Sequence, residues 1–136
     1  MTLVVDASVT AKWFIQEPET PFAEAILAQG PVIAPDLIVA EVTNVAWTRV
    51  RLGRLSLSQA QALSRKLGNM FAELIPCAQL AAHAIEIAIA FDHPVYDAYY
   101  LAVAESAKTE LVTADGALFW KTRRTRFARL VRPLVR

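Results

Sequence analysis

The sequence predicts an α/β fold, built around a five-stranded parallel sheet in a single domain, residues 1–136. Short apolar segments alternate along the chain with longer amphipathic ones, and this alternation is typical of parallel sheets. A chain of 136 residues that is 55% hydrophobic can build one compact core but is too small for two domains. No apolar run approaches the ~20 residues that cross a bilayer, and the N-terminal residues lack the features of a signal peptide. We therefore expect a cytoplasmic protein.

The first strand is expected at 2–5, where four apolar or β-branched residues suit a strand that is buried on both faces. A short helix should follow at 9–15. The second helix should begin with Thr20 as its N-cap and Pro21 at its first helical position, and it should end at Gly30. The side chains that this helix buries are expected to be Phe22, Ala25 and Ile26.

The next elements are a strand at 32–34 and a long helix at 37–52. Asp36 is the expected N-cap of this helix, and Gly53 is the expected terminator. The sequence Ser58-Gln59-Ala60-Gln61 has the spacing of a capping box and predicts another helix that reaches residue 70 or 71.

The second half of the chain continues the alternation. A strand at 73–76 precedes a helix that runs from Ala78 to the Asp-His-Pro sequence that breaks it, and the next helix covers 95–108. The remaining strands are expected at 111–113 and near 130–131, with a helix between them. These two strands complete a sheet of five.

Four acidic residues fall where strand ends and helix starts converge. Asp6 and Asp115 each follow a strand, and ligands of open α/β sheets bind at the carboxyl ends of strands. Asp97 lies in the first turn of its helix, and Glu41 lies near the apolar side of its helix, where an unpaired carboxylate is costly. Each acid alone could be an ordinary helix cap or a solvent-facing side chain. Together, four converging carboxylates require a cation, and such oxygen ligands favour Mg²⁺ or Mn²⁺ over zinc.

Metal sites based on histidine or cysteine are excluded by the residue counts. His83 and His93 are the only histidines, too few for a histidine metal site. Cys77 is the only cysteine, so the chain can form neither an intramolecular disulfide nor a thiolate cluster. We expect Cys77 to be a buried core thiol.

Charge is distributed unevenly along the chain. Seven of the 14 basic residues lie within 121–136, where there is no acid, so residues 1–120 carry seven basic and all 13 acidic side chains. Such asymmetry indicates a polyanionic partner. The alternative is a solvated end whose arginines pair with acids elsewhere in the domain.

The motifs around these acids resemble those of the PIN-domain ribonucleases and, within that family, of the VapC-type toxins of bacterial and archaeal toxin–antitoxin pairs. The resemblance covers nearly the whole chain. It is carried by four motifs in order, namely Val4–Ser8, Pro35–Leu37 leading to Glu41, Val95–Ala102 and Leu111–Asp115.

The resemblance implies a role for individual residues. It assigns the catalytic acids to Asp6, Glu41, Asp97 and Asp115, of which Asp6, Asp97 and Asp115 are the expected metal ligands. The accessory positions of the family fall on Ser8 and Thr113, and Asn44 is a further candidate.

The resemblance also implies the fold and the reaction. The fold is a three-layer α/β/α sandwich with strand order 3-2-1-4-5, which places the strands that end in Asp6 and Asp115 side by side at the topological switch point. The reaction is hydrolysis of an RNA phosphodiester by a water that Mg²⁺ or Mn²⁺ activates, with no protein nucleophile. The implied partners are the RNA substrate, a cognate antitoxin protein and a second copy of the chain.

Two surfaces are candidates for these partners. An acidic crevice repels RNA, so we assign attraction to the arginines of the C-terminal segment, Arg123, Arg124, Arg126 and Arg129. These arginines could instead hold the terminal strand in place. The large apolar side chains of the first half, among them Trp13, Phe14 and Trp47, suit a dimer or an antitoxin, unless all three tryptophans are buried in the monomer. Tyr96, Tyr99 and Tyr100 suit packing better than base stacking.

Three other functions each match a part of the sequence. Asp6-Ala7-Ser8-Val9-Thr10 loosely resembles phosphohydrolases that form an aspartyl-phosphate, but no lysine follows a strand end to assist that chemistry. A hydrolase built on Ser8, His93 and Asp97 would need a nucleophile elbow that the sequence lacks. A non-catalytic RNA-binding or partner-binding module would not need four acids, because phosphate groups are bound by basic side chains and not by carboxylates.

Overall fold

The protein folds around a five-stranded parallel sheet. The computed structural model describes residues 1–136, and the strand order is β3-β2-β1-β4-β5. The central strand β1 pairs with β2 through Val4 and Ile33, and with β4 through Val4 and Leu111. The predicted fold class and strand order are confirmed. The strands are β1 (Leu3–Val5), β2 (Val32–Pro35), β3 (Glu73–Ile75), β4 (Leu111–Thr113) and β5 (Val131–Pro133).

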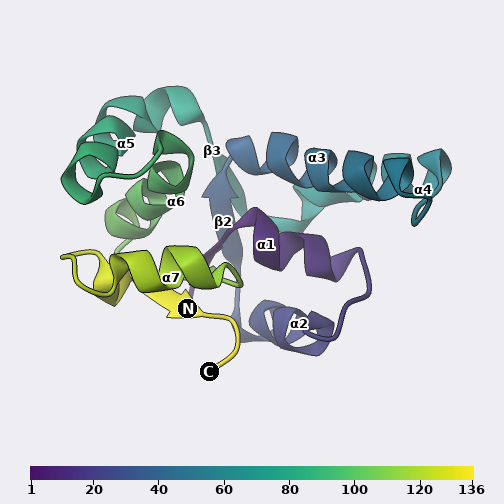
Figure 1. Cartoon of the computed structure of the whole chain (residues 1–136), viewed down its shortest axis with the longest axis horizontal. Coiled ribbons are helices and arrows are strands. Elements are labelled where there is room, and N and C mark those ends of the chain that lie inside the picture. Colours follow the sequence, from purple (N-terminus) through teal and green to yellow (C-terminus); the bar gives the residue numbers. More distant parts are fainter.

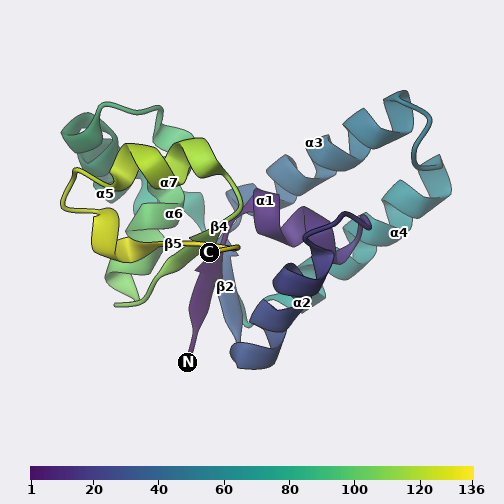
Figure 2. The same ribbon diagram turned by 60° about the horizontal axis from the view of Figure 1, so that its bottom comes forward.

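Helices cover both faces of the sheet. The α-helices are α1 (Ala7–Thr10), α2 (Thr20–Gln29), α3 (Leu37–Arg51), α4 (Leu57–Leu67), α5 (Cys77–Phe91), α6 (Val95–Ser106) and α7 (Gly116–Thr122). Figures 1 and 2 show α5, α6 and α7 on one side of the sheet and α1 to α4 on the other. Right-handed crossovers between parallel strands require this division, because the chain reverses its direction across the sheet after β3. Short 3₁₀ turns η1 (Ala11–Trp13), η2 (Gly68–Met70) and η3 (Ala128–Leu130) complete the chain.

The core lies between the central strands and α6. Every residue of β1 is buried, and α6 contacts β1, β2 and β4 while α5 packs against α6 from outside. Helix α6 is therefore enclosed for most of its length, with Ala98, Leu101 and Ala102 fully buried. This packing fixes the carboxyl end of β1 relative to the first turn of α6. None of the helices has the length and apolar character needed to cross a membrane.

Helix α2 buries Ile26 as predicted, but the prediction was wrong for Phe22 and Ala25. Phe22 is 49% exposed and Ala25 is exposed, whereas Ala23 and Ile26 are buried. Thr20 is already the first residue of the helix, and its hydroxyl accepts a hydrogen bond from the Glu17 amide at 2.9 Å. Thr20 therefore closes the preceding loop and does not act as the predicted N-cap.

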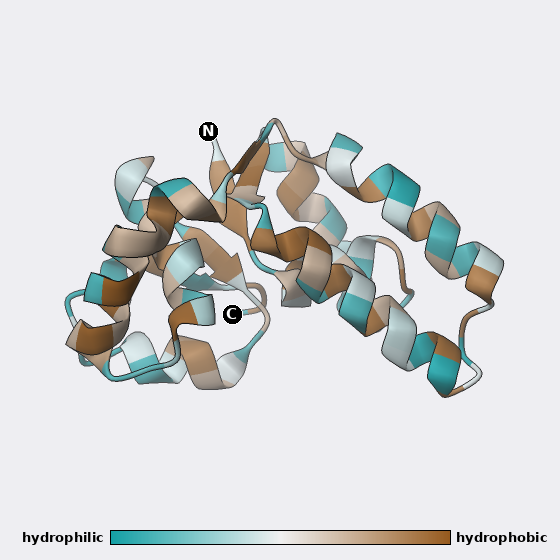
Figure 3. Cartoon of the chain, turned by 90° about the horizontal axis from the view of Figure 1, so that it is seen from above, coloured by the Kyte–Doolittle hydropathy of each residue, from teal (hydrophilic) through white to brown (hydrophobic).

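Helix α4 begins earlier than predicted. The capping box forms between Ser56 and Gln59, and not from Ser58 to Gln61. The two overlapping segments have the same Ser-x-x-Gln spacing, so the local pattern cannot choose between them. The choice follows from the turn that returns the chain from α3, where Gly53 has φ +74°. Helices α3 and α4 project side by side from the sheet and show hydrophobic and polar residues in alternation (Figure 3).

Asp36 is the N-cap residue of α3, as predicted, but its side chain serves another helix. Its backbone is already helical, with φ −65° and ψ −14°, and its side chain makes no capping bond to α3. The carboxylate instead accepts a 3.0 Å hydrogen bond from the amide of Cys77, the first residue of α5. Hydrogen bonding by the backbone and the side chain of Cys77 lowers the pKa of Asp36. Cys77 itself is only partly buried, so the expectation of a buried core thiol was wrong.

Candidate active site

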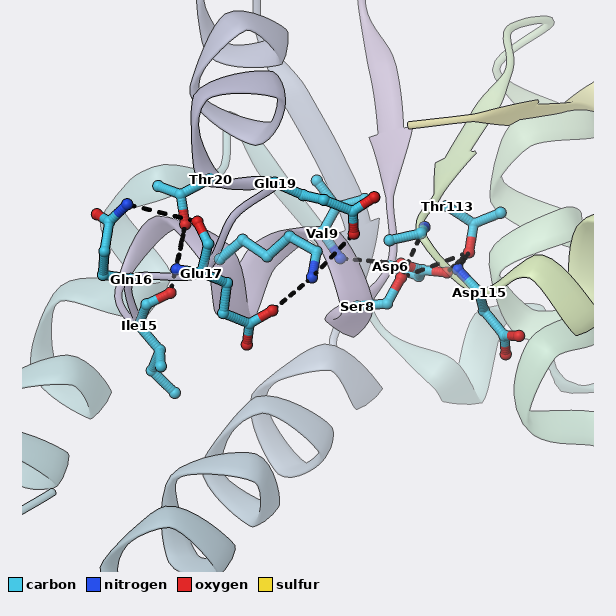
Figure 4. A network of polar contacts seen from close by, with 12 residues as sticks. Asp6, Ser8, Val9, Ile15, Gln16, Glu17, Glu19, Thr20, Thr113 and Asp115 are labelled. Atoms are coloured by element: carbon cyan, nitrogen blue, oxygen red, sulfur yellow. Dashed lines mark hydrogen bonds and ion pairs between the residues drawn. The ribbon is translucent and has the colours of Figure 1, made fainter. Parts of the chain in front are cut away.

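Asp6 is buried at the carboxyl end of β1. Only 6% of the residue is exposed. One carboxylate oxygen accepts hydrogen bonds from the Ser8 hydroxyl at 2.5 Å and from the Val9 amide at 3.3 Å, and the Thr113 hydroxyl donates to the other oxygen (Figure 4). Asp6 is thus the N-cap of α1 and the acid at the strand end at the same time. Both interpretations of this residue hold together.

Ser8 and Thr113 join the ends of the two central strands. The Ser8 hydroxyl accepts a 2.9 Å bond from the amide of Ala114, and the Thr113 hydroxyl accepts a 3.0 Å bond from the amide of Asp115. Each hydroxyl therefore donates a hydrogen bond to Asp6, which follows β1, and accepts one from a backbone amide of the segment that follows β4. These contacts hold the Asp6 carboxylate in one orientation.

The environment of Asp6 disfavours its charge. The pKa of Asp6 is raised to about 6, mainly by burial and to a smaller extent by the negative charge of Asp97, while the bonds from Ser8, Thr113 and Val9 act in the opposite direction. No lysine or arginine forms an ion pair with Asp6. The carboxylate would gain from a cation bound beside it.

Glu41 faces the same region from α3. The hydroxyl of Tyr100, which is fully buried in α6, donates to one Glu41 oxygen. Burial raises the pKa of Glu41, and the charge of Asp97 adds to this effect while the bond from Tyr100 opposes it. The pKa of Tyr100 is also raised, by burial first and then by the charge of Glu41. Tyr100 therefore remains a donor that fixes the Glu41 side chain across the gap between α3 and α6.

Asp97 lies in the first turn of α6 and is held by His93. The distance between His93 Nε2 and Asp97 Oδ2 is 2.5 Å. The imidazole stacks on Phe91, with ring centroids 4.9 Å apart, and its backbone amide bonds to the carbonyl of Ala88 at 3.1 Å. The loop between α5 and α6 thus fixes the carboxylate of Asp97.

Asp115 follows β4, at the same edge of the sheet as Asp6, but its carboxylate does not face Asp6. It is the N-cap of α7, and Oδ1 accepts bonds from the amides of Ala117 at 3.0 Å and Leu118 at 3.2 Å. The residue is exposed, and Figure 4 shows its side chain pointing away from Asp6. The capping role that the sequence also allowed is the one that the structure contains.

The structure therefore brings three of the four acids together. The charge of Asp97 acts on Asp6 and on Glu41, whereas the carboxylate of Asp115 is turned to the amides of α7. The side chains form no cluster of three or more metal-ligating groups ready to hold an ion. The donor set nevertheless fits Mg²⁺ or Mn²⁺, because Glu41, Asp97 and Asp115 each keep one oxygen without a hydrogen bond and all the donors are carboxylates.

Asn44 lies beside this cluster. It is exposed on α3, one turn after Glu41, and both residues line an open hollow of about 460 Å³ together with Tyr96. The Asn44 side chain has no hydrogen-bond partner within the chain, so it is free to contact a ligand in the hollow.

The four candidate arginines have different environments. Arg123 donates to the carbonyls of Phe119, Ala128 and Val131, and its guanidinium lies 4.0 Å from the ring centroid of Phe119. Arg126 forms an ion pair with Glu105 at 2.9 Å. Arg124 and Arg129 are exposed and form no ion pair. Only these last two present an uncommitted guanidinium to solvent.

Two residues of the cluster were not identified as such from the sequence. His93 lies four positions before Asp97, but Pro94 stands between them and removes the helical geometry that would make this spacing a signal. Tyr100 lies one turn after Asp97, and its distance of 59 positions from Glu41 leaves no local pattern that pairs them. The only available signal was a polar tip on an aromatic side chain expected in the core, since a buried tyrosine hydroxyl needs a partner.

The chain was compared with known proteins. The family model described as "PIN domain" matches residues 3–123. A protein named Ribonuclease VapC3, from Pyrobaculum aerophilum, is 33% identical over 121 residues, which cover 87% of this chain and 92% of that protein. The crystal structure of PAE2754, also from Pyrobaculum aerophilum, has a similar fold, with a TM-score of 0.69, 24% identity, and coverage of 98% of this chain and 84% of that one. The chain therefore belongs to the PIN-domain family, in agreement with the resemblance of its acidic motifs.

Proposed function

We propose that this protein is a Mg²⁺-dependent or Mn²⁺-dependent endoribonuclease, the toxin of a toxin–antitoxin pair. The observation that carries the proposal is Asp6, a buried carboxylate at the end of the central strand, with Asp97 and Glu41 beside it and no lysine or arginine paired with any of the three. Such a group of carboxylates can bind a cation, and the bound cation can contact the phosphodiester of a substrate. The name of the similar protein Ribonuclease VapC3 supports RNA as the substrate.

The side chains divide the work of such a site. Asp6, Asp97 and Asp115 would hold the cation, which when bound supplies an activated water and neutralises charge on the phosphate. Asp115 can join the set through the carboxylate oxygen that its capping bonds leave free. Ser8 and Thr113 orient Asp6, and Glu41 is the remaining catalytic acid.

Three further residues support this cluster. Tyr100 orients Glu41 and His93 orients Asp97, each through a single hydrogen bond. Asn44 lies where it can contact the RNA in the hollow beside Glu41.

We also propose that the exposed side chains Arg124 and Arg129 supply the attraction for the RNA backbone, whereas the contacts of Arg123 and Arg126 favour a structural role for these two.

The contacts of Lys12 and Ser8 disfavour two other mechanisms. Lys12 pairs with Glu17 at 2.6 Å and Glu19 at 3.5 Å, so it does not serve Asp6 as the lysine of an aspartyl-phosphate enzyme would. Ser8 donates to Asp6 while His93 bonds Asp97, so no serine nucleophile is paired with a histidine base.

Exposed apolar side chains support protein partners. Trp47 is 57% exposed and Trp120 is 72% exposed, so the possibility that all three tryptophans are buried was wrong. We propose that residues 1–136 form a single PIN domain that acts in the cytoplasm, as a homodimer and with a cognate antitoxin. Light scattering at micromolar concentration tests the dimer, and a monodisperse monomer would refute it.

The test of the proposed function is a cleavage assay on purified protein with total RNA, with Mg²⁺ or with a chelator. We expect cleavage only with the cation, and we expect Asp6→Asn, Asp97→Asn and Asp115→Asn each to abolish it while circular dichroism stays unchanged. Glu86→Gln is the matched control, because Glu86 is an exposed acid of α5 without an ion-pair partner. Full activity in two of the three aspartate variants would contradict the proposed site, and mapping of new 5′ ends would identify the RNA.

A further inference from the structure

A cavity of about 710 Å³ opens between α7 and the C-terminal segment. At one end it is bordered by Thr113 and Asp115, the residues at which β4 leaves the sheet. Its wall includes the aromatic side chains Phe119 and Trp120, and its other side is formed by Arg129 and Arg132. The cavity thus reaches the carboxyl end of β4, where the candidate metal ligand Asp115 lies.

The wall of this cavity is built from fixed contacts. The three carbonyl bonds of Arg123 tie α7 to η3 and β5, and its guanidinium stacks on Phe119. The amide of Leu134 bonds the carbonyl of Thr113 at 2.7 Å, so the segment after β5 is anchored to β4. A ligand would meet a preformed surface.

The cations of the cavity are free to meet an anion. Arg129 has no hydrogen-bond or ion-pair partner, and Arg132 bonds only the uncharged side chain of Gln29, at 3.1 Å. Glu19 and Glu110 also line the cavity, and Glu19 lies 3.5 Å from Lys12, which Glu17 shares.

Trp120 offers an uncovered aromatic face next to these cations. It contacts Phe119 edge to face at a centroid distance of 5.3 Å, and its indole NH donates to no group of the chain. Single-stranded nucleic acids bind surfaces that combine stacking aromatic rings with cations along the backbone. A cavity of this size lies within the range of ligand sites, roughly 300–1,000 Å³.

We infer that this cavity is a subsite for single-stranded RNA, which holds a nucleotide that flanks the phosphodiester to be cleaved. Trp120 stacks on the base, and Arg129 and Arg132 contact the adjoining phosphates. The inference rests on the proposed ribonuclease function, because the position of the cavity at the end of β4 is what relates it to the reacting phosphate. An acidic peptide is the competing occupant, but a base uses the aromatic face of Trp120 as well as the arginines.

The test is binding of a short oligouridylate to the Asp6→Asn protein, which removes cleavage from the measurement. Trp120→Ala should weaken binding roughly 5- to 150-fold, the range expected for loss of one stacked base, and Trp120→Phe should restore most of it. Phe22→Ala is the matched control, because Phe22 is also an exposed aromatic side chain and lies on α2 outside the cavity. Replacing Arg129 and Arg132 by Gln should flatten the dependence of log affinity on log salt by roughly 0.7 for each lost phosphate contact.

The outcomes separate this inference from the proposed function. Equal weakening by Trp120→Ala and Phe22→Ala, or none by either, would overturn the subsite even if the wild-type protein cleaves RNA. If binding depends on Trp120 but the wild-type protein cleaves no RNA, the result would support an RNA subsite and contradict the proposed nuclease function. Binding of oligoglutamate that depends on Trp120, without binding of oligouridylate, would overturn the inference in favour of an acidic protein partner.

Discussion

His93 Nε2 lies 2.5 Å from Asp97 Oδ2, and the other ring nitrogen of His93 is buried without a partner. A buried ring nitrogen without a partner is less costly as a bare acceptor than as an N–H group. The proton of a neutral ring therefore belongs on Nε2, where it is donated to Asp97. In this arrangement His93 orients the carboxylate and leaves Oδ1 of Asp97 free for a cation.

His93→Leu should reduce cation-dependent RNA cleavage by about 10- to 100-fold, the usual cost of removing a group that orients a metal ligand. His93→Gln should retain most activity, because its amide can still donate to Asp97. His83→Leu is the control, since His83 makes a similar 2.8 Å contact with Glu105 elsewhere. Equal losses in the two His93 variants would show that the bond to Asp97 is not what matters.

Mg²⁺ or Mn²⁺ should raise the melting temperature of the wild-type protein. A cation that binds only the folded acidic cluster stabilises it by mass action, ~2.7 kcal/mol at a hundredfold excess over its dissociation constant. Asp6→Asn should reduce this shift, and Glu86→Gln should not, because Glu86 lies outside the cluster. Differential scanning calorimetry with and without the cation measures the effect. Equal shifts in wild type and Asp6→Asn would place the ions elsewhere.

Asp36 should stabilise the fold in a pH-dependent way. Its pKa is lower in the folded protein than the ordinary value of about 3.9, because Cys77 donates hydrogen bonds to the charged form. A depressed pKa means that the stabilisation is complete above pH ~4 and is lost as the pH falls through the folded pKa. Asp36→Ala should therefore lower the free energy of unfolding at neutral pH by about 1 kcal/mol, the usual effect of losing a helix cap.

Urea denaturation at neutral pH and below pH ~4 checks this expectation, since the difference between wild type and Asp36→Ala should shrink in acid. Asp36→Asn keeps an acceptor for the Cys77 amide without a titrating charge, so it should be less destabilised than Asp36→Ala at neutral pH. A constant difference between wild type and Asp36→Ala at all pH values would refute the role of the charge.

Arg123 and Arg124 are adjacent but should respond differently to substitution by glutamine. Arg123→Gln should lower the free energy of unfolding by about 1–3 kcal/mol, because three backbone carbonyls lose a charged donor. Arg124→Gln should leave stability unchanged and, if Arg124 contacts a phosphate, should reduce the salt dependence of RNA binding by roughly 0.7. Thermal melts and titrations on both variants measure the two effects. The opposite pattern would return Arg123 to the RNA surface.

The sequence by itself determined the order of the elements and the position of the acids along them. The strand at 3–5 and the acid after it are readable locally, because a buried strand needs consecutive apolar residues and ends where they stop. The same local reasoning placed Asp115 after β4 and Asp97 in the first turn of α6. It predicted a sheet whose central strand ends carry carboxylates.

The tertiary structure decided which of these groups meet. Asp36 bonds a residue 41 positions away, and Glu41 bonds a tyrosine 59 positions away, so neither partner leaves a trace in the neighbouring sequence. Arg123 and Arg124 look alike in the sequence, but only Arg123 faces the carbonyls of η3 and β5. Asp115 follows a strand as Asp6 does, yet its carboxylate turns to the amides of α7. A polar side chain bonds to the donor or acceptor that lies nearest to it in space. Only the packing of the helices on the sheet determines which group that is.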